Sequence, residues 1–134
     1  MVTGIHHINF LVRDLDTAVE RYRALLGISE VIYGDLAGRA VRTARFKVGD
    51  AWWVLVQPTT ADSVAARHLA ERGEGFFLIS LGVPSLDAAC EDVISGGGTF
   101  TSAAPRQGLE DWQVIDLDSR QLFGVQIQLC QSSD

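Results

Sequence analysis

The side chain best suited to chemistry in this 134-residue chain is that of His7, the second of two adjacent histidines, His6 and His7. An imidazole can give or take a proton at working pH, and it is also a common metal ligand. The pair lies in an apolar run that reads as a strand and leads into the segment 14–18, Asp-Leu-Asp-Thr-Ala. Alternation along a strand would turn the two rings to opposite faces. We expect His7 to face the site and His6 to face the helices.

The same pattern returns in the second half of the chain. Leu15-Asp16 and Leu86-Asp87 each open a helix-like segment after an apolar run, and they stand 71 positions apart. A repeat of this size predicts two copies of one supersecondary unit. The second copy carries Phe76-Phe77 where the first carries His6-His7. Any metal site once shared by the two copies would have lost donor atoms there.

Hydrophobic periodicity and turn residues predict two βαβββ units. The first unit is expected to contain a strand at 4–12, a helix from Asp14 or Asp16 to Leu26, and strands at 28–33, 39–48 and 51–57. A linking helix at 62–72 precedes a second unit with a strand at 75–83, a helix at 85–95, a short strand near 99–101, a loop at 103–111, and strands at 112–117 and 123–130. We expect one domain over residues 1–134, with module one at about 1–58, the linking helix at about 62–73 and module two at about 75–131.

Composition narrows the classes of partner. The net charge of −6 argues against nucleic acid or an anionic membrane surface, because both select clustered lysine and arginine. No apolar segment is long enough to span a bilayer, and the N-terminus lacks the pattern of a signal peptide. Cys90 and Cys130 form no CxxC motif, so we expect reduced thiols and a cytoplasmic location.

Three segments carry a family pattern: Ile5-His6-His7-Ile8 through Leu25-Leu26-Gly27; Val56-Gln57-Pro58 with Asp62-Ser63-Val64-Ala65 and Arg72-Gly73-Glu74-Gly75; and Gly124-Val125-Gln126-Ile127-Gln128-Leu129. These segments resemble the vicinal oxygen chelate superfamily, the group of glyoxalases, bleomycin-resistance proteins and extradiol dioxygenases. The middle segment is most similar to the methylmalonyl-CoA epimerase branch. The resemblance implies an α+β fold in which two βαβββ modules form a cup-shaped mixed β-sheet flanked by helices, often in a homodimer.

The resemblance also implies where a metal would bind. In metal-dependent members each module supplies two ligands, and the four positions correspond here to His7, Val54, Phe77 and Gln128. Valine and phenylalanine have no donor atoms, and a divalent metal needs three or four. We therefore expect no metal at the family position and no cofactor.

Strand alternation predicts the lining of the cup. His7 would be the acid/base group, with Asn9 and Gln128 orienting it or binding a substrate carbonyl. The expected substrate-binding residues are Trp52, Val54, Phe77, Ile79, Trp112, Phe123, Gln126 and Arg45, the last for a carboxylate or phosphate. The alternative is ordinary core in which the polar groups bond to one another, with the arginines of the third strand on a solvated edge.

Three functions follow from this lining. The residues favour a metal-independent enzyme that performs a lyase, isomerase or cyclase-type proton transfer on an apolar oxygenated or aromatic small molecule. The alternative is a non-catalytic protein that binds and sequesters an aromatic compound. The third is a metal-dependent epimerase or glyoxalase-like enzyme. In each case the expected partner is a small molecule, and we expect a homodimer.

Overall fold

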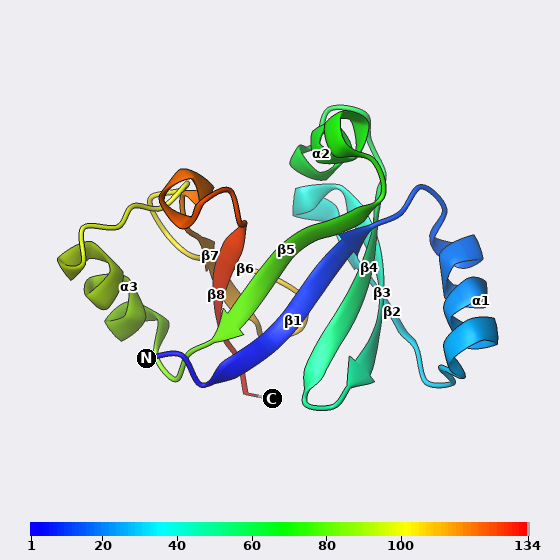
Figure 1. Cartoon of the computed structure of the whole chain (residues 1–134), viewed down its shortest axis with the longest axis horizontal. Coiled ribbons are helices and arrows are strands. Elements are labelled where there is room, and N and C mark those ends of the chain that lie inside the picture. The colour runs from blue at the N-terminus through cyan, green and yellow to red at the C-terminus, as the bar shows by residue number, and fades with distance from the viewer. Residues whose placement is uncertain (134) are drawn as a thin grey trace. The chain divides into compact units, whose positions relative to one another are not determined.

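The computed structural model describes residues 1–133, which pack as two compact units (Figure 1). One unit is formed by residues 8–77, and the other by residues 1–7 together with the segment from Leu78 onward. Two strands, β1 (Gly4–Leu11) and β5 (Gly75–Gly82), contribute residues to both units. The expectation of a single domain over the whole chain stays a prediction.

In the unit of residues 8–77 the strand order is β2-β3-β4-β1. Strand β3 (Val41–Val48) pairs antiparallel with β2 (Ile32–Leu36) and with β4 (Ala51–Pro58). Helix α1 (Leu15–Leu26) packs on β3 and β4, and helix α2 (Val64–Arg72) follows β4. The apolar side chains of α1 recur at helical spacing and enter the core of this unit, which contains Leu15, Val19, Ala44, Phe46 and Leu55.

In the other unit the strand order is β1-β5-β8-β7-β6. Strand β5 pairs parallel with β8 (Ile127–Gln131), whereas β8 pairs antiparallel with β7 (Gln113–Asp116), and β7 with β6 (Arg106–Gln107). The sheet is therefore mixed. Helix α3 (Leu86–Ser95) covers it through a core that contains Val83, Leu86, Ala89, Ile115 and Leu129.

Helices α1 and α3 begin in the same way. Asp14 caps α1 by accepting a hydrogen bond from the Thr17 amide, and Ser85 caps α3 by accepting one from the Ala88 amide. The first backbone amide of each helix also donates a hydrogen bond to the side chain of a glutamine on a strand of the same unit: Leu15 to Gln57 and Leu86 to Gln131. Helix α1 ends at Gly27, whose φ of 67° is a left-handed conformation that favours glycine. The predicted helix boundaries agree with the structure to within two residues.

The segment between α3 and β7 differs most from expectation. The predicted strand near 99–101 is only an isolated bridge between Phe100 and Leu117, and strand β6 lies inside the predicted loop at 103–111. Two backbone hydrogen bonds explain β6: the Gly108 amide donates to the Trp112 carbonyl at 2.7 Å, and the Trp112 amide donates to the Leu109 carbonyl at 2.9 Å. This tight turn reverses the chain and lets β6 pair with β7. Likewise, β2 begins at Ile32 rather than at residue 28.

Across residues 1–133, none of the helices has both the length and the apolar character required to span a membrane.

Candidate functional site

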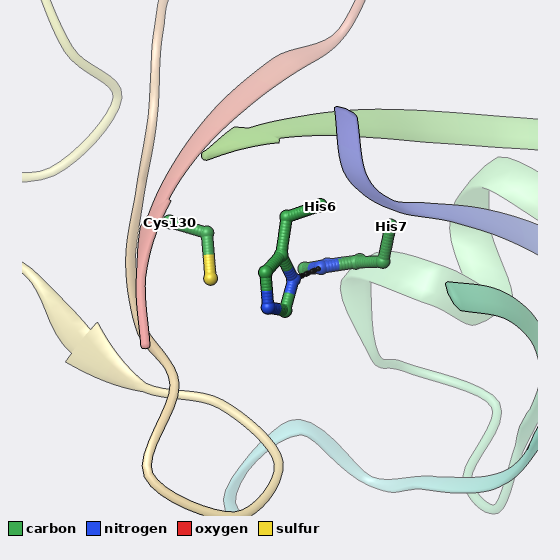
Figure 2. Close-up of side chains that lie close together, drawn as sticks. All are labelled: His6, His7 and Cys130. Atoms are coloured by element: carbon green, nitrogen blue, oxygen red, sulfur yellow. Dashed lines mark hydrogen bonds between the residues drawn. The ribbon is translucent and has the colours of Figure 1, made fainter. Parts of the chain in front are cut away.

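His6 and His7 form a hydrogen-bonded pair. Their Nδ1 atoms lie 2.8 Å apart (Figure 2). Nε2 of His6 lies 2.8 Å from Oγ of Ser132. One Nδ1 must carry the proton and the other must accept it, because two lone pairs cannot bond to each other. Strict alternation predicts that the two rings point to opposite faces, yet they meet in a T-shaped arrangement, with centroids 5.1 Å apart and planes at 82°. Sequence reasoning therefore missed His6, for which the only signal was its position beside His7.

Trp112 holds this pair from one side. Its indole stacks on the His7 ring with centroids 4.6 Å apart and meets the His6 ring edge-on at 4.7 Å. His7 and Trp112 are buried, with 3% and 2% of their surface exposed. The Gly108–Trp112 turn carries the indole to this place. Trp112, one of the substrate-binding residues expected from sequence, lies against His7 in the structure.

Cys130 completes the cluster. It lies on β8, and its thiol is directed toward the His6 ring (Figure 2). One donor atom from each of His6, His7 and Cys130 lies within 4.8 Å of the others. The Cys130 side chain is 1% exposed. Within the part of the chain that the structure describes, this is where histidine and cysteine side chains cluster closely enough to share one metal ion.

Gln128 belongs to a second polar group in the same unit. Its Nε2 donates to Oδ1 of Asp116 at 3.0 Å, and Nη1 of Arg106 donates to Oδ2 of Asp116 at 2.6 Å. The remaining amide oxygen of Gln128 is buried and has no hydrogen-bond partner among the described residues. The hydroxyl of Ser80, which is in register with Gln128, is likewise buried without a partner. Buried polar atoms in native proteins are almost always satisfied, so these two can receive hydrogen bonds from a ligand or from water.

A third group lies in the unit of residues 8–77. The guanidinium carbon of Arg45 lies 4.9 Å from the centre of the Trp52 ring, and Nζ of Lys47 lies 4.4 Å from it. Arg45 is in register with Val54 and is 4% exposed, so it is buried rather than on a solvated edge. The amide oxygen of Asn9 is buried without a hydrogen-bond partner among the described residues. The structure thus brings Arg45, Trp52 and Val54 together.

The other expected binding residues are more dispersed. Phe77 packs edge-on against His68 at 4.8 Å, and the Ile79 amide donates to the Gln126 carbonyl at 3.0 Å. Leu81 packs in the core beneath α3. Ile79 is two residues before Leu81 on β5, so its side chain points to the same face of the sheet, toward α3. Phe123 is 98% exposed in a left-handed conformation, so it lines no pocket in this structure.

The donor set does not fit the family metal. Of the four positions that the resemblance implies, Val54 and Phe77 offer no nitrogen, oxygen or sulfur. Alternation along β5 places Leu78 on the face that Ser80 shares with Gln128, and leucine also has no donor atom. Only His7 and Gln128 remain, and two ligands are too few for a divalent ion.

The chain is similar to known proteins in both sequence and fold. The family model for the glyoxalase/bleomycin resistance protein/dioxygenase superfamily matches residues 6–115. A curated relative, the uncharacterized protein YqjC of Bacillus subtilis, is 24% identical over 127 residues, which are 95% of this chain and 91% of the relative.

Solved structures of methylmalonyl-CoA epimerases are similar over the whole chain. A variant of the Streptomyces coelicolor enzyme in complex with 2-nitronate-propionyl-CoA is 30% identical, with a TM-score of 0.94 and full coverage of both chains. The Mycobacterium tuberculosis enzyme is also 30% identical, with a TM-score of 0.93 over 99% of this chain and 90% of that one. The expected α+β glyoxalase-like fold is confirmed. The chain belongs to the glyoxalase/bleomycin resistance protein/dioxygenase superfamily.

Proposed function

We propose that this chain is a metal-independent enzyme that moves a proton on a small molecule, with His7 as the acid/base group. The observation that carries the proposal is the hydrogen bond between the Nδ1 atoms of His6 and His7, at 2.8 Å. A general base needs a partner that fixes its tautomer and accommodates the proton it gains. His6 is placed to be that partner.

The hydrogen-bond chain defines how the pair would work. With Nε2–H of His6 donating to Ser132 Oγ, Nδ1 of His6 is an acceptor, and it accepts from Nδ1–H of His7. In this tautomer Nε2 of His7 carries a lone pair, with which it would take a proton from the substrate. The imidazolium formed at His7 keeps its bond to His6. In the return step Nε2–H of His7 gives the proton back at a different carbon, or at the same carbon once the planar intermediate has turned its other face toward His7.

Gln128 would position the substrate. The amide nitrogen of Gln128 donates a hydrogen bond to Asp116, which fixes the orientation of the amide group. The buried amide oxygen would then accept a hydrogen bond from a substrate hydroxyl or N–H. This assignment favours an oxygenated substrate over a wholly apolar one. Ser80, in register with Gln128, can donate to a carbonyl.

The reaction class is supported by the relatives. The similar solved structures are named as methylmalonyl-CoA epimerases, enzymes that invert a carbon centre. Because two of the four family metal positions, Val54 and Phe77, lack donor atoms here, a chain that keeps this chemistry needs stabilising groups other than that metal. Gln128 and Ser80, which carry buried polar atoms in the same unit as His7, are the candidates.

The experiment is proton exchange in D2O, which detects proton abstraction even when no net product forms. The untagged protein, treated with a chelator, is incubated with methylmalonyl-CoA, other acyl thioesters and a panel of aromatic ketones, and loss of the proton beside the carbonyl is followed by NMR. We expect exchange on at least one compound and a rate about 10²–10⁴-fold lower for His7→Gln. His68→Gln is the matched control, because His68 is the third histidine of the chain and lies on α2.

The other two functions are distinguishable outcomes. Tight binding of a panel compound without exchange would replace the proposal with sequestration. Exchange that appears only after a divalent metal is added would replace it with a metal-dependent enzyme. Equal exchange rates for wild type and a folded His7→Gln protein would remove His7 from the reaction.

A further inference from the structure

We propose that His6, His7 and Cys130 form a binding site for a thiophilic divalent ion of the zinc type, distinct from the family metal position. Two imidazole nitrogens and a thiolate sulfur are the ligands that such ions select over the oxygen ligands of magnesium or calcium. The three donor groups come from β1 and β8 of the same unit (Figure 2). Binding is a property of this cluster alone and does not depend on the proposed reaction.

The geometry is close to that of a bound site. Tetrahedral zinc with N and S ligands separates its donor atoms by about 3.3–3.6 Å. The two Nδ1 atoms are 2.8 Å apart, and all three donors lie within 4.8 Å of one another. Small side-chain rotations therefore suffice to bring the donors to bonding distance. The ion would replace the proton that now lies between the two imidazoles, and the displaced proton would move to Nε2 of the ring that carried it.

The surroundings support the ligand roles. A metal-bound histidine usually donates its other ring N–H to a fixed partner, and Nε2 of His6 is 2.8 Å from Oγ of Ser132. Stacking on Trp112 fixes the plane of the His7 ring. Binding would release one proton, from the Cys130 thiol, so the ion and its three ligands carry one net positive charge. The fourth tetrahedral position stays open to water or to an anionic ligand.

This site differs from the one that the family resemblance implies. His6 and Cys130 stand at none of the four family positions, and only His7 is common to both. The proton displaced by the ion would occupy Nε2 of His7, which is the atom that takes the substrate proton in the proposed reaction. Metal occupancy and proton transfer by His7 therefore exclude each other. For this reason the test uses the protein without substrate.

The test is titration of the untagged, chelator-treated protein with Zn²⁺ by calorimetry and with Co²⁺ by absorption. We expect one Zn²⁺ per chain, no binding of Mg²⁺, and a thiolate-to-cobalt charge-transfer band in the near ultraviolet. His6→Gln should weaken Zn²⁺ binding more than Ser132→Ala does, because it removes a ligand and not an outer partner; the Ser132 change should cost about tenfold or more. Cys130→Ser should abolish the charge-transfer band.

Matched controls exist within the chain. His68→Gln and Cys90→Ser remove a histidine and a cysteine that lie on other elements, so both should bind zinc as the wild type does. Absence of a charge-transfer band in the wild-type protein would overturn the proposal without any variant. Equal zinc affinity for wild type and His6→Gln, which changes a partly exposed side chain, would do so as well.

Discussion

The imidazole of His7 lies face to face with the indole of Trp112, with the ring planes 21° from parallel. The same indole meets the His6 ring at 85°, so one side chain fixes the planes of both imidazoles. Stacked and edge-on contacts of this kind each contribute about 0.5–1.5 kcal/mol beyond the area they bury. The consequence is that the Nδ1 atoms meet at one defined angle, as either a proton relay or a chelate requires.

Removing the indole should damage both stability and the histidine pair. We expect Trp112→Ala to lower the free energy of unfolding by about 3–5 kcal/mol, because it empties a buried aromatic site. Trp112→Phe keeps a ring against His7 and should cost distinctly less. Urea unfolding followed by circular dichroism measures both. Equal losses for the two variants would show that the ring contact with His7 carries no part of the stability.

Two glutamines, at equivalent positions in the two modules, each accept a hydrogen bond from the first backbone amide of a helix. Oε1 of Gln57 accepts from the Leu15 amide at 2.8 Å, and Oε1 of Gln131 accepts from the Leu86 amide at 2.7 Å. These amides open α1 and α3, where no partner within the helix is available. The internal repeat seen in the sequence therefore extends to the way in which a strand holds a helix.

Loss of the Gln57 contact should leave a helix amide unsatisfied. We expect Gln57→Leu to lower the free energy of unfolding by about 1 kcal/mol. Gln57→Glu is the matched control, because it keeps an acceptor and places a negative charge at the helix N-terminus, where it is favourable. Gln131→Leu should cost less, because Gln131 is exposed and water can replace it. A larger loss for Gln131→Leu than for Gln57→Leu in chemical denaturation would contradict this account.

The sequence predicted the elements better than it predicted the site. Helices α1 and α3 were readable because capping residues and apolar spacing agree at Asp14 and Ser85. Strand β6 was not, because it depends on a turn closed by the backbone of Gly108 and Trp112, for which no residue pattern is diagnostic. The two-residue β6 is also shorter than any periodicity can indicate.

The site was only partly predictable for a related reason. His7 and Gln128 stand at positions that the family pattern marks, so the sequence singles them out as candidates. Alternation with a period of two predicts that His6 points to the opposite face of the strand from His7. In the structure the His6 ring instead contacts the His7 ring. Cys130 and Ser132 lie far from His6 in sequence, so only the pairing of strands could reveal that they approach it.

Stability should depend on pH through His68. Burial, with a further contribution from the charge of Arg72, holds the pKa of this imidazole below its ordinary value of 6.5. The unfolded chain therefore binds a proton at pH values where the folded chain resists it, so the stabilisation is complete above 6.5 and is lost as the pH falls toward the folded pKa. We expect the stability advantage of wild type over His68→Gln to shrink between about pH 7.5 and about pH 5. Urea midpoints at both pH values measure it, and an advantage that grows on acidification would contradict the assigned direction.

Asp116 should contribute more to the free energy of unfolding than Arg106, its ion-pair partner. Its two carboxylate oxygens hold different groups, Nη1 of Arg106 at 2.6 Å and Nε2 of Gln128 at 3.0 Å. The side chains of Arg106 and Asp116 are 29% and 24% exposed, so solvent screens their attraction only in part. Arg106→Ala removes one of these bonds, whereas Asp116→Ala removes both and leaves the Gln128 amide buried without an acceptor. We expect Asp116→Ala to cost about 1.5–3 kcal/mol and Arg106→Ala about 1 kcal/mol.

Asp116→Asn separates the two roles of this carboxylate. Its amide oxygen can still accept from Gln128, but its amide nitrogen would face the Nη1 donor of Arg106, so its cost should be at least that of Arg106→Ala. In a double-mutant cycle, Asp116→Asn should cost much less when Arg106 is already alanine, so the coupling energy should be at least the whole cost of Arg106→Ala. Independent, additive effects would mean that the short contact between Arg106 and Asp116 contributes nothing to stability. In that case Asp116 would hold Gln128 without help from the arginine.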